Sequence, residues 1–456
     1  MTGDPPPWSM GPDLPSGLPR NPLTPLDSRQ GCLVSARPCL SAGQKKASCI
    51  VEPVGIIAVL DIGTSKISAA VAEVAASGTI TVIGAGRAEN AGIRSGVVVD
   101  LEATSRSIRA AADAAESQSG YKIEQAIVSV SGRHLESQTT SGQVAVRGTN
   151  REVTAEDISR VLEIAQAVEL PATRELLHVL PGSYTLDGQE GVLSPLGMSA
   201  LRLEVRTHLV TASAPAINNL AKAVKSAGID PVELVAAPLA TAMATTTESE
   251  RMLGAAVIDV GAGTTDVALY SNGVFTYLAS IPVGGEHIVR DVAVGLRLGL
   301  HEARRVVEEA GTVVLRQPNA ESGWIELDGI APIRRVDLAR IMEARSREIF
   351  ELAAREIGTA SPEAILGGTI ISGGVASITG MASLVADVVG TPTRVAAEFS
   401  LYGLTDKIGG PAYAGTAGLL AWGAAGVEAG ESTTSGSIAD RVSTFVRSVA
   451  GRLGRR

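Results

Sequence analysis

Two short segments of this chain share one pattern: an apolar run, an aspartate, an apolar residue, a glycine, a turn and a second apolar run. A glycine-bearing hairpin can point several backbone N–H groups at one anion, and glycine lets a phosphate approach the backbone closely. Hydroxyl side chains in both turns add further donors. We therefore predict that the paired turns bind a nucleotide triphosphate, through Asp61, Gly63, Thr64, Ser65, Lys66, Asp259, Gly261, Ala262, Gly263, Thr264 and Thr265.

The aspartates that precede the two glycines suit a metal ion. We predict that Asp61 and Asp259 hold Mg²⁺, largely through water, because magnesium keeps much of its hydration shell. Lys66, beside the first turn, either reaches a phosphate or points outward from its strand. Each turn alone is compatible with an ordinary tight hairpin, but two turns in the same strand context favour phosphate binding.

A third glycine segment lies downstream of both turns. Residues 368–375 read as a strand that runs into a double glycine, and a helix is predicted near 377–389. A backbone without side chains can lie flat against a purine and its ribose. We expect the nucleoside to rest on Gly373, Gly374 and Val375.

Strands and helices alternate along the chain after its first fifty residues, which predicts an α/β fold. The first turn is flanked by strands at 56–60 and 67–74, with a third strand at 79–84. The second turn is flanked by strands at 255–258 and 267–270. A repeat at so long a spacing indicates two similar domains rather than a solenoid. Since clefts between domains commonly bind ligands, we expect the two turns to face each other across one.

The composition excludes several classes of protein. A chain of 456 residues with 45% apolar and 19% charged residues is typical of globular proteins with more than one domain. A net charge of −9 argues against a nucleic-acid binder. All three cysteines lie within the first fifty residues, so no disulfide framework holds the body, which suits a reducing compartment. Residues 1–52 hold nine of the 22 prolines and no signal-peptide pattern, and we predict a disordered extension.

Two C-terminal segments raise the question of a membrane. Residues 408–427 carry no charge but are only weakly apolar, so we predict a buried helix near 412–423 rather than a span. After a polar linker at 428–437, the segment 438–456 places apolar residues three and four apart and carries five arginines against one aspartate. It is predicted to lie in the surface of an anionic membrane, the alternative being a helix packed on the body. The membrane-facing residues would be Ile438, Val442, Phe445, Val446, Val449 and Leu453, with Arg441, Arg447 and Arg452.

The order of two phosphate hairpins followed by a strand and a double glycine resembles the actin-fold ATPases. Within them, the chain is similar to the FtsA family of bacterial cell-division proteins over about residues 54–427, and again in its last nineteen residues. The segments that carry the resemblance are 57–71, 92–101, 177–181 with Tyr184, 195–198, 257–270 and 404–406.

The resemblance implies an actin-like fold of two facing domains around a nucleotide cleft, with an inserted FtsA-type subdomain and a C-terminal amphipathic helix. It implies ATP and Mg²⁺ as cofactors, self-association, binding of the C-terminal peptide of the tubulin-like FtsZ, and recruitment of later division proteins. The implied location is the cytoplasmic face of the bacterial inner membrane at the division septum, as a peripheral protein on anionic lipid. In actin-fold proteins a basic helix packs on the adenosine, so Arg304 or Arg305 is expected to do so, a solvated helix face being the alternative.

The repeat and the resemblance together predict the order of domains. Each actin-like domain is interrupted by an insertion, and the smaller subdomain of the second half is expected to take the FtsZ peptide. The predicted parts are an extension (1–52), a first domain (53–130, 212–245 and 391–427), an inserted subdomain (131–211), a second domain (246–285 and 367–390), its smaller subdomain (286–366), a linker (428–437) and a membrane tail (438–456).

The remaining residues of chemical interest point to weak catalysis. In related actin-fold ATPases a glutamate that positions water precedes a Pro-Leu-Ala segment, whereas this chain has Ala237 there, so we predict slow or negligible hydrolysis, with Asp266 as the remaining candidate. A chaperone would need a substrate domain after the double glycine, and a sugar kinase would need a catalytic acid; neither is apparent. The nearest alternative is a pilus-assembly relative without a membrane tail. His134, His178 and His208 are isolated and predicted to be structural.

Overall fold

The computed structural model describes residues 53–315, 323–360, 365–397 and 399–428. The predicted extension and membrane tail lie outside these residues, and so do all the residues predicted to face the membrane. Of the linker predicted at 428–437, only Glu428 is described, and it ends helix α10, Ala414–Glu428, and is not part of a linker. The chain divides into two units, residues 1–50 and 51–456, and the description concerns the second.

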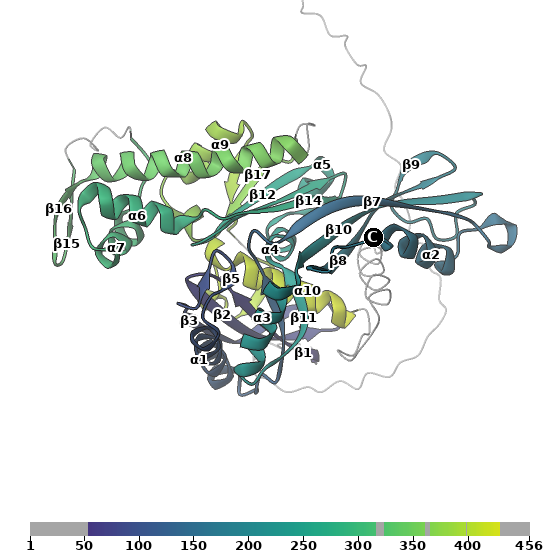
Figure 1. Cartoon of the computed structure of the whole chain (residues 1–456), viewed down its shortest axis with the longest axis horizontal. Coiled ribbons are helices and arrows are strands. Elements are labelled where there is room, and N and C mark those ends of the chain that lie inside the picture. The colour runs from purple at the N-terminus through teal and green to yellow at the C-terminus, as the bar shows by residue number, and fades with distance from the viewer. Residues whose placement is uncertain (1–52, 316–322, 361–364, 398, 429–456) are drawn as a thin grey trace, which may run out of the picture. The chain divides into compact units, whose positions relative to one another are not determined.

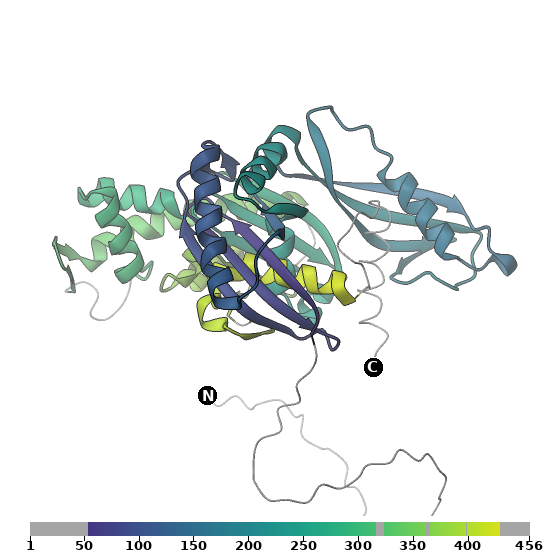
Figure 2. The same cartoon turned by 90° about the horizontal axis from the view of Figure 1, so that it is seen from below.

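The first hairpin belongs to a six-stranded sheet in the order β11-β6-β1-β2-β3-β19. Strands β1 and β2 are antiparallel and flank the turn, and β6 runs parallel to β1. Helix α1 lies on one face of this sheet and α10 on the other (Figure 2). The elements are β1 Pro53–Ile62, β2 Lys66–Ala75, β3 Ile80–Glu89, α1 Leu101–Ser119, β6 Gln125–Val130, β11 Asp230–Ala236, β19 Leu401–Gly403 and α10 Ala414–Glu428.

The alternation of side chains along β1 decides which face each residue serves. Leu60 packs in the core that includes Ile108 of α1. Val59 packs in a second core that includes Leu419 of α10. Asp61 therefore points to the α10 side, at the end of a strand that is buried on both faces.

The second hairpin belongs to a five-stranded sheet in the order β14-β13-β12-β17-β18. The long helix α8 runs along this sheet, and α6, α7 and the hairpin β15–β16 lie at one end of it (Figure 1). The elements are β12 Ala255–Val260, β13 Thr265–Ser271, β14 Val274–Ile281, α6 Gly285–Leu296, α7 Leu300–Ala310, β15 Trp324–Leu327, β16 Ile330–Arg334, α8 Arg335–Ala360, β17 Thr369–Ser372, α9 Met381–Val389 and β18 Thr393–Val395.

Residues 136–213 form a separate four-stranded antiparallel sheet in the order β7-β10-β8-β9, covered by α2 (Figure 1). A capping box starts α2: the Thr154 and Asp157 side chains are each bonded to the other's backbone N–H. The elements are β7 Glu136–Ala145, α2 Ala155–Gln166, β8 Arg174–Leu186, β9 Gln189–Val192 and β10 Arg202–Ser213.

Three helices complete the described residues of the first half and its connection to the second. They are α3 Ala214–Ser226, α4 Ala237–Thr245 and α5 Glu248–Leu253. Two further short strands, β4 Ile93–Arg94 and β5 Val97–Val98, pair with each other.

The structure extends one predicted strand and shifts one predicted helix. Strand β3 continues to Glu89 instead of stopping at residue 84, because its glycines make room for a helix rather than a turn. A Cβ on Gly86 would lie 1.9 Å from the Ala111 carbonyl oxygen of α1. After the double glycine a 3₁₀ turn, Gly374–Ser377, comes first, and α9 begins only at Met381.

The C-terminal part of the described chain agrees with a buried helix. Helix α10 begins at Ala414, two residues later than predicted, and Leu419 and Leu420 are fully buried. No helix within the described ranges is long and apolar enough to cross a membrane. Strand β18 joins the second sheet, so the return to the first sheet comes after Val395, later than the predicted boundary at residue 391.

Candidate nucleotide-binding site

A cavity of about 500 Å³ is lined by the turns of both hairpins and by the double-glycine segment. The structure thus brings together at one place residues that are far apart in the sequence. All but two of the predicted nucleotide-binding residues line it, namely Asp61, Gly63, Thr64, Ser65, Lys66, Asp259, Gly261, Ala262, Gly263, Thr264, Arg304, Gly373, Gly374 and Val375.

The two exceptions have other roles. Thr265 is fully buried, and its hydroxyl donates to the Val283 carbonyl oxygen at 2.8 Å. Arg305 does not line the cavity; its guanidinium pairs with Glu309 at 3.3 Å and donates to the Asp328 carbonyl oxygen. Of the two arginines predicted to pack on adenosine, the structure brings only Arg304 to the cavity.

The first hairpin is closed by its own backbone and held by an asparagine that the sequence did not single out. The Gly63 N–H donates to the Lys66 carbonyl oxygen at 3.0 Å. Asn90 donates from its amide to the Gly63 carbonyl oxygen at 2.8 Å and from its backbone N–H to Ser65 at 2.9 Å. These bonds fix the turn, while Thr64 and Ser65 face the cavity.

Asp61 is fixed by two hydroxyl groups from distant parts of the chain. Ser129, at the end of β6, donates to one carboxylate oxygen at 3.0 Å, and Thr416 of α10 donates to the other at 3.0 Å. Ser129 in turn accepts from the Ile62 N–H at 2.8 Å. Because each bond spans dozens to hundreds of residues, neither partner is visible from the local sequence.

The second hairpin is built in the same way and docks on the start of α6. The Gly261 N–H donates to the Thr264 carbonyl oxygen at 2.9 Å. The N–H groups of Gly285 and Glu286 donate to the carbonyl oxygens of Gly261 and Ala262, both at 2.8 Å. The turn is therefore set by the helix that follows the sheet.

The two turns meet at Gly263. A Cβ on this glycine would lie 2.6 Å from the Thr64 hydroxyl oxygen and 2.9 Å from its methyl carbon. Both belong to the facing hairpin, so a side chain at residue 263 would force the two turns apart or fill the space between them.

Two aspartates of the second hairpin lie opposite each other across the strand pair β12–β13. Burial raises the pKa of Asp259 to about 6, with the nearby Asp61 acting in the same direction, although Ser372 donates to it at 3.0 Å. Burial also raises the pKa of Asp266 to about 7; a bond from Ser280 opposes this, and the charges of Asp259 and Asp61 add to it.

This acidic pair fits a divalent cation bound largely through water. A cation would relieve the repulsion among Asp61, Asp259 and Asp266, all of which line the cavity. Within the part of the chain that the structure describes, no group of three or more His, Cys, Asp or Glu side chains is arranged to hold a metal ion by itself. Magnesium does not require such a group, because it keeps several waters and takes the rest of its ligands from phosphate.

Lys66 is the cation nearest to the first turn. Its ammonium donates to the Ala412 carbonyl oxygen at 2.7 Å and lies 3.7 Å from the centre of the Tyr413 ring. Burial lowers the pKa of Lys66, and the Asp61 charge partly offsets this. The Lys66 side chain lines the cavity, so the alternative prediction that it points outward from its strand is wrong.

The double glycine has a backbone that other residues cannot adopt easily. Gly373 has φ 85°, and a Cβ there would lie 2.2 Å from the Val260 carbonyl oxygen. At Gly374, by contrast, an added Cβ would meet open space. Arg304 of α7 also lines the cavity; it donates to Glu286 at 3.3 Å and remains partly exposed. The cavity wall therefore includes bare backbone at Gly374 and a guanidinium at Arg304.

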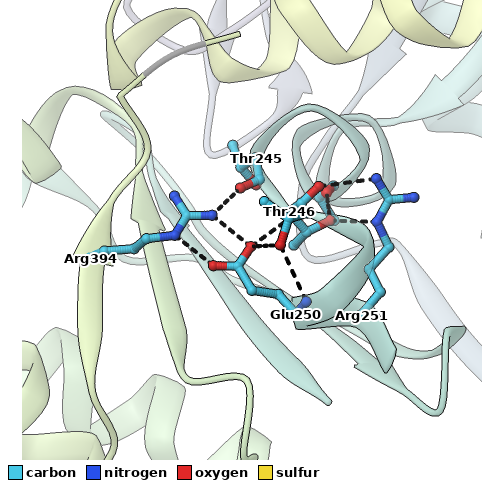
Figure 3. Close-up of polar contacts among 7 residues, drawn as sticks. Thr245, Thr246, Glu250, Arg251 and Arg394 are labelled. Carbon is cyan, nitrogen blue, oxygen red and sulfur yellow. Dashed lines mark hydrogen bonds and ion pairs between the residues drawn. The ribbon is translucent and has the colours of Figure 1, made fainter. Parts of the chain in front are cut away.

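Helix α4 starts at the cavity and ends at a polar cluster (Figure 3). At its cavity end, the Thr241 hydroxyl donates to Asp259 at 3.4 Å. At its far end, Arg394 binds both carboxylate oxygens of Glu250 at 2.7 and 2.8 Å and donates to the Thr245 carbonyl oxygen at 2.6 Å. Burial alone would raise the pKa of Glu250, but the bonds from Arg394 and Thr247 outweigh it and lower the pKa to about 2.

None of the three singled-out histidines lines the cavity. His178 is buried, accepts from the Ala236 N–H at 3.0 Å and lies 5.2 Å from the Trp422 ring, and burial lowers its pKa to about 3. His208 packs edge-on against Phe275, and burial lowers its pKa to about 4. Both are neutral structural side chains, as their apolar surroundings predict.

Two sheets that each present a glycine hairpin to one shared cavity define the actin-like ATPase fold. A solved structure described as the PilM–PilN type IV pilus biogenesis complex shares it, with a TM-score of 0.57 over 81% of this chain and 98% of that chain. The sequence identity is 17%, so this likeness shows the fold alone. The predicted fold class is thereby confirmed, except for the C-terminal amphipathic helix, which lies outside the described residues.

Sequence comparisons identify the family. Residues 132–211 match the family model for the SHS2 domain inserted in FtsA, and residues 256–418 match the model for cell division protein FtsA. The chain is 37% identical over 369 residues to cell division protein FtsA of Pseudomonas aeruginosa, covering 80% of this chain and 88% of the relative. It is 35% identical over 341 residues to the Bacillus subtilis protein of the same name, covering 74% and 77%. The chain therefore belongs to the FtsA family of cell division proteins.

Proposed function

We propose that this chain binds ATP with Mg²⁺ in the cavity and serves as the anchor that holds the tubulin-like FtsZ to the cytoplasmic face of the inner membrane at the division septum. The observation that carries the proposal is one cavity lined by two like hairpins, with buried carboxylates and a lysine in its wall. Membership of the FtsA family supplies the cell-division setting.

The nucleotide is proposed to lie with its phosphates between the two turns. The N–H groups and hydroxyls of residues 63–65 and 261–264 would contact phosphate oxygens, and Lys66 would turn from the Ala412 carbonyl to a phosphate. Asp61 and Asp259 would orient the water around Mg²⁺, which supplies charge neutralisation of the phosphates. Gly373, Gly374 and Val375 would support the adenosine, with Arg304 on its other side.

We propose that hydrolysis is slow and that the nucleotide acts mainly as a structural switch for self-association. The cavity wall at the start of α4 is Ala237, which has no group to orient water. General-base assistance of about 10²–10⁴-fold is therefore absent unless Asp266 supplies it. We expect turnover below about 1 s⁻¹, near the low end for enzymes. Faster turnover, measured as phosphate release, would contradict the switch.

The FtsZ peptide is proposed to bind the subdomain at 286–366. Two strongly exposed apolar residues support this location: Val294 near the end of α6 is 81% exposed, and Leu300 at the start of α7 is 61% exposed. A pulldown with the FtsZ C-terminal peptide is the experiment that tests the proposed function. We expect Val294→Glu and Leu300→Glu to reduce capture of the peptide. Leu253→Glu is the control, because Leu253 is also exposed but lies on α5, outside residues 286–366, and it should leave capture unchanged. If the unaltered chain captures no peptide, the pilus-assembly type of adaptor becomes the better description.

Attachment to anionic inner-membrane lipid is proposed to reside in residues 438–456. The support is the sequence pattern alone: an apolar repeat and a local excess of arginine in a chain of net charge −9. Co-sedimentation with anionic liposomes should be lost in a chain that ends at Gly436 and in Phe445→Glu. Equal sedimentation of both variants and the full chain would place the anchor elsewhere. The inserted subdomain at residues 131–211 is the proposed contact for later division proteins.

A further inference from the structure

An arginine on β3, which the sequence analysis did not single out, lines the nucleotide cavity. Arg87 is exposed and contributes to the cavity wall beside the first turn. Within the described ranges, its guanidinium has no hydrogen bond or ion pair with another residue. An unpaired guanidinium at the wall of a cavity is available to a ligand.

Strand register places this arginine in line with the first hairpin's aspartate. Asp61 pairs with Ser68 on β2, and Ser68 pairs with Arg87 on β3. Directly opposed residues share a face, so all three lie on the α10 side of the sheet. The Ser68 hydroxyl between them is buried without a hydrogen-bond partner in the described part of the chain. The row thus runs from the Asp61 carboxylate to the Arg87 guanidinium, which no other described residue binds.

The charge of Arg87 also acts on Lys66, the other cation at the first hairpin. Burial and the Asp61 charge have the larger effects on the pKa of Lys66, and the Arg87 charge lowers it further. Lys66 on β2 and Arg87 on β3 lie on the same face of the sheet, and their two positive charges repel each other. An anion that contacts both cations removes this repulsion. A guanidinium can hold a phosphate with two parallel hydrogen bonds.

We propose that Arg87 is a further phosphate ligand that favours a nucleoside triphosphate over a diphosphate. The inference rests on the proposed function of the cavity. Lys66 alone supplies one cation at the first turn, and Arg87 supplies the second. Since a triphosphate carries more negative charge than a diphosphate, the pair of cations matches the triphosphate better.

The test is calorimetric titration of the full chain with ATP and with ADP, each with Mg²⁺. Arg87→Gln removes the charge from an exposed side chain, so the fold should be retained, which thermal unfolding checks. We expect ATP affinity to fall about tenfold, the size of one charge-assisted hydrogen bond, and ADP affinity to change less than about twofold. Arg87→Lys keeps the charge but cannot make two parallel hydrogen bonds, so its ATP affinity should lie between those of Arg87→Gln and the unaltered chain.

Arg94→Gln is the matched control, because Arg94 is a nearby exposed arginine on β4 that does not line the cavity. It should bind both nucleotides like the unaltered chain. Unchanged ATP affinity in Arg87→Gln, or an equal loss for ATP and ADP, would overturn the proposal while leaving the nucleotide site intact. Absence of binding to the unaltered chain would instead refute the proposed function and this inference with it.

Discussion

At the first hairpin the residue opposite Asp61 across the strand pair is Ser68, whereas at the second hairpin the residue opposite Asp259 is Asp266. The first hairpin adds a cation, Lys66, while the second adds none to the cavity. The backbone pattern of the two turns is nevertheless the same, with a glycine N–H bonded to the carbonyl three residues on. On the proposed function, the duplicated backbone would provide two sets of phosphate donors, and Asp61 and Asp259 would share the metal. Lys66 would give the first hairpin an added role toward the phosphate charge, and Asp266 would give the second hairpin an added role toward the metal.

The largest effect is expected where the two hairpins touch. Gly263→Val places a side chain against Thr64, within 2.6 Å of its hydroxyl oxygen at the Cβ alone. It should weaken ATP binding at least about tenfold, or ~1.4 kcal/mol, measured by calorimetry. Gly358→Val on α8 is the control, since a Cβ there meets open space, and it should bind like the unaltered chain. If both variants bind ATP equally well, the phosphates do not lie between the turns.

The division of tasks predicts that variants of the two hairpins respond differently to magnesium. Lys66→Ala should weaken ATP binding about tenfold whether or not Mg²⁺ is present, because it removes a phosphate contact. Asp259→Ala should remove most of the strengthening by Mg²⁺ and change metal-free binding little. Titrations of both variants with and without Mg²⁺ measure this. Identical magnesium dependence in the two would show that the hairpins do not differ in role.

A smaller effect concerns pH. The pKa values of Asp259 and Asp266 are raised to about 6 and about 7 from 3.8, so between about pH 4 and pH 7 the folded ligand-free chain holds protons that the unfolded chain has released. Its free energy of unfolding therefore falls as pH rises through this window, by at most about 1.4 kcal/mol per pH unit for each group. In Asp266→Asn the free energy of unfolding should fall less steeply with pH, which thermal unfolding measured across this pH range would show.

The counterpart in the first hairpin provides the control for the pH effect. Ser68→Ala removes the residue that is opposite Asp61 but has no titrating group, so its pH profile should run parallel to that of the unaltered chain. Parallel profiles for Asp266→Asn as well would mean that the second hairpin's acid pair does not hold a proton.

The smallest effect on ATP is expected at the far end of α4. Arg394→Met breaks the bonds to Glu250 and Thr245 shown in Figure 3 and should cost about 1 kcal/mol of stability, because the pair is partly exposed. Arg106→Met, which loses the more exposed pair with Glu102, should cost less. ATP affinity should change less than about twofold in both. A loss of ATP affinity in Arg394→Met as large as that in Asp259→Ala would show that the polar cluster at the far end of α4 affects Asp259 through this helix.

Much of this site was predictable because its signals are local. Glycine spacing located both turns, and the aspartate before each glycine located two of the carboxylates that line the cavity. What could not be predicted depends on tertiary contact. Ser129 and Thr416 bind Asp61 only once β6 and α10 are in place.

One error of interpretation has a physical cause. The strand predicted to stop at residue 84 continues to Glu89, because Gly84 and Gly86 let α1 approach the sheet and do not end the strand, and the extension includes Arg87. Strand β8 likewise continues through Pro181 and Gly182 at a bulge, where the pairing with β10 shifts between Val205 and Thr207. In both places a residue type that usually ends a strand is used for close packing or a bend.

The most direct test of the account is a crystal structure of the full chain with Mg²⁺ and a non-hydrolysable ATP analogue. The account predicts phosphate oxygens in contact with both turns, Gly63 to Ser65 on one side and Gly261 to Thr264 on the other, with the metal joined to Asp259 through water. A nucleotide whose phosphates contact only one hairpin, or which binds outside this cavity, would contradict it.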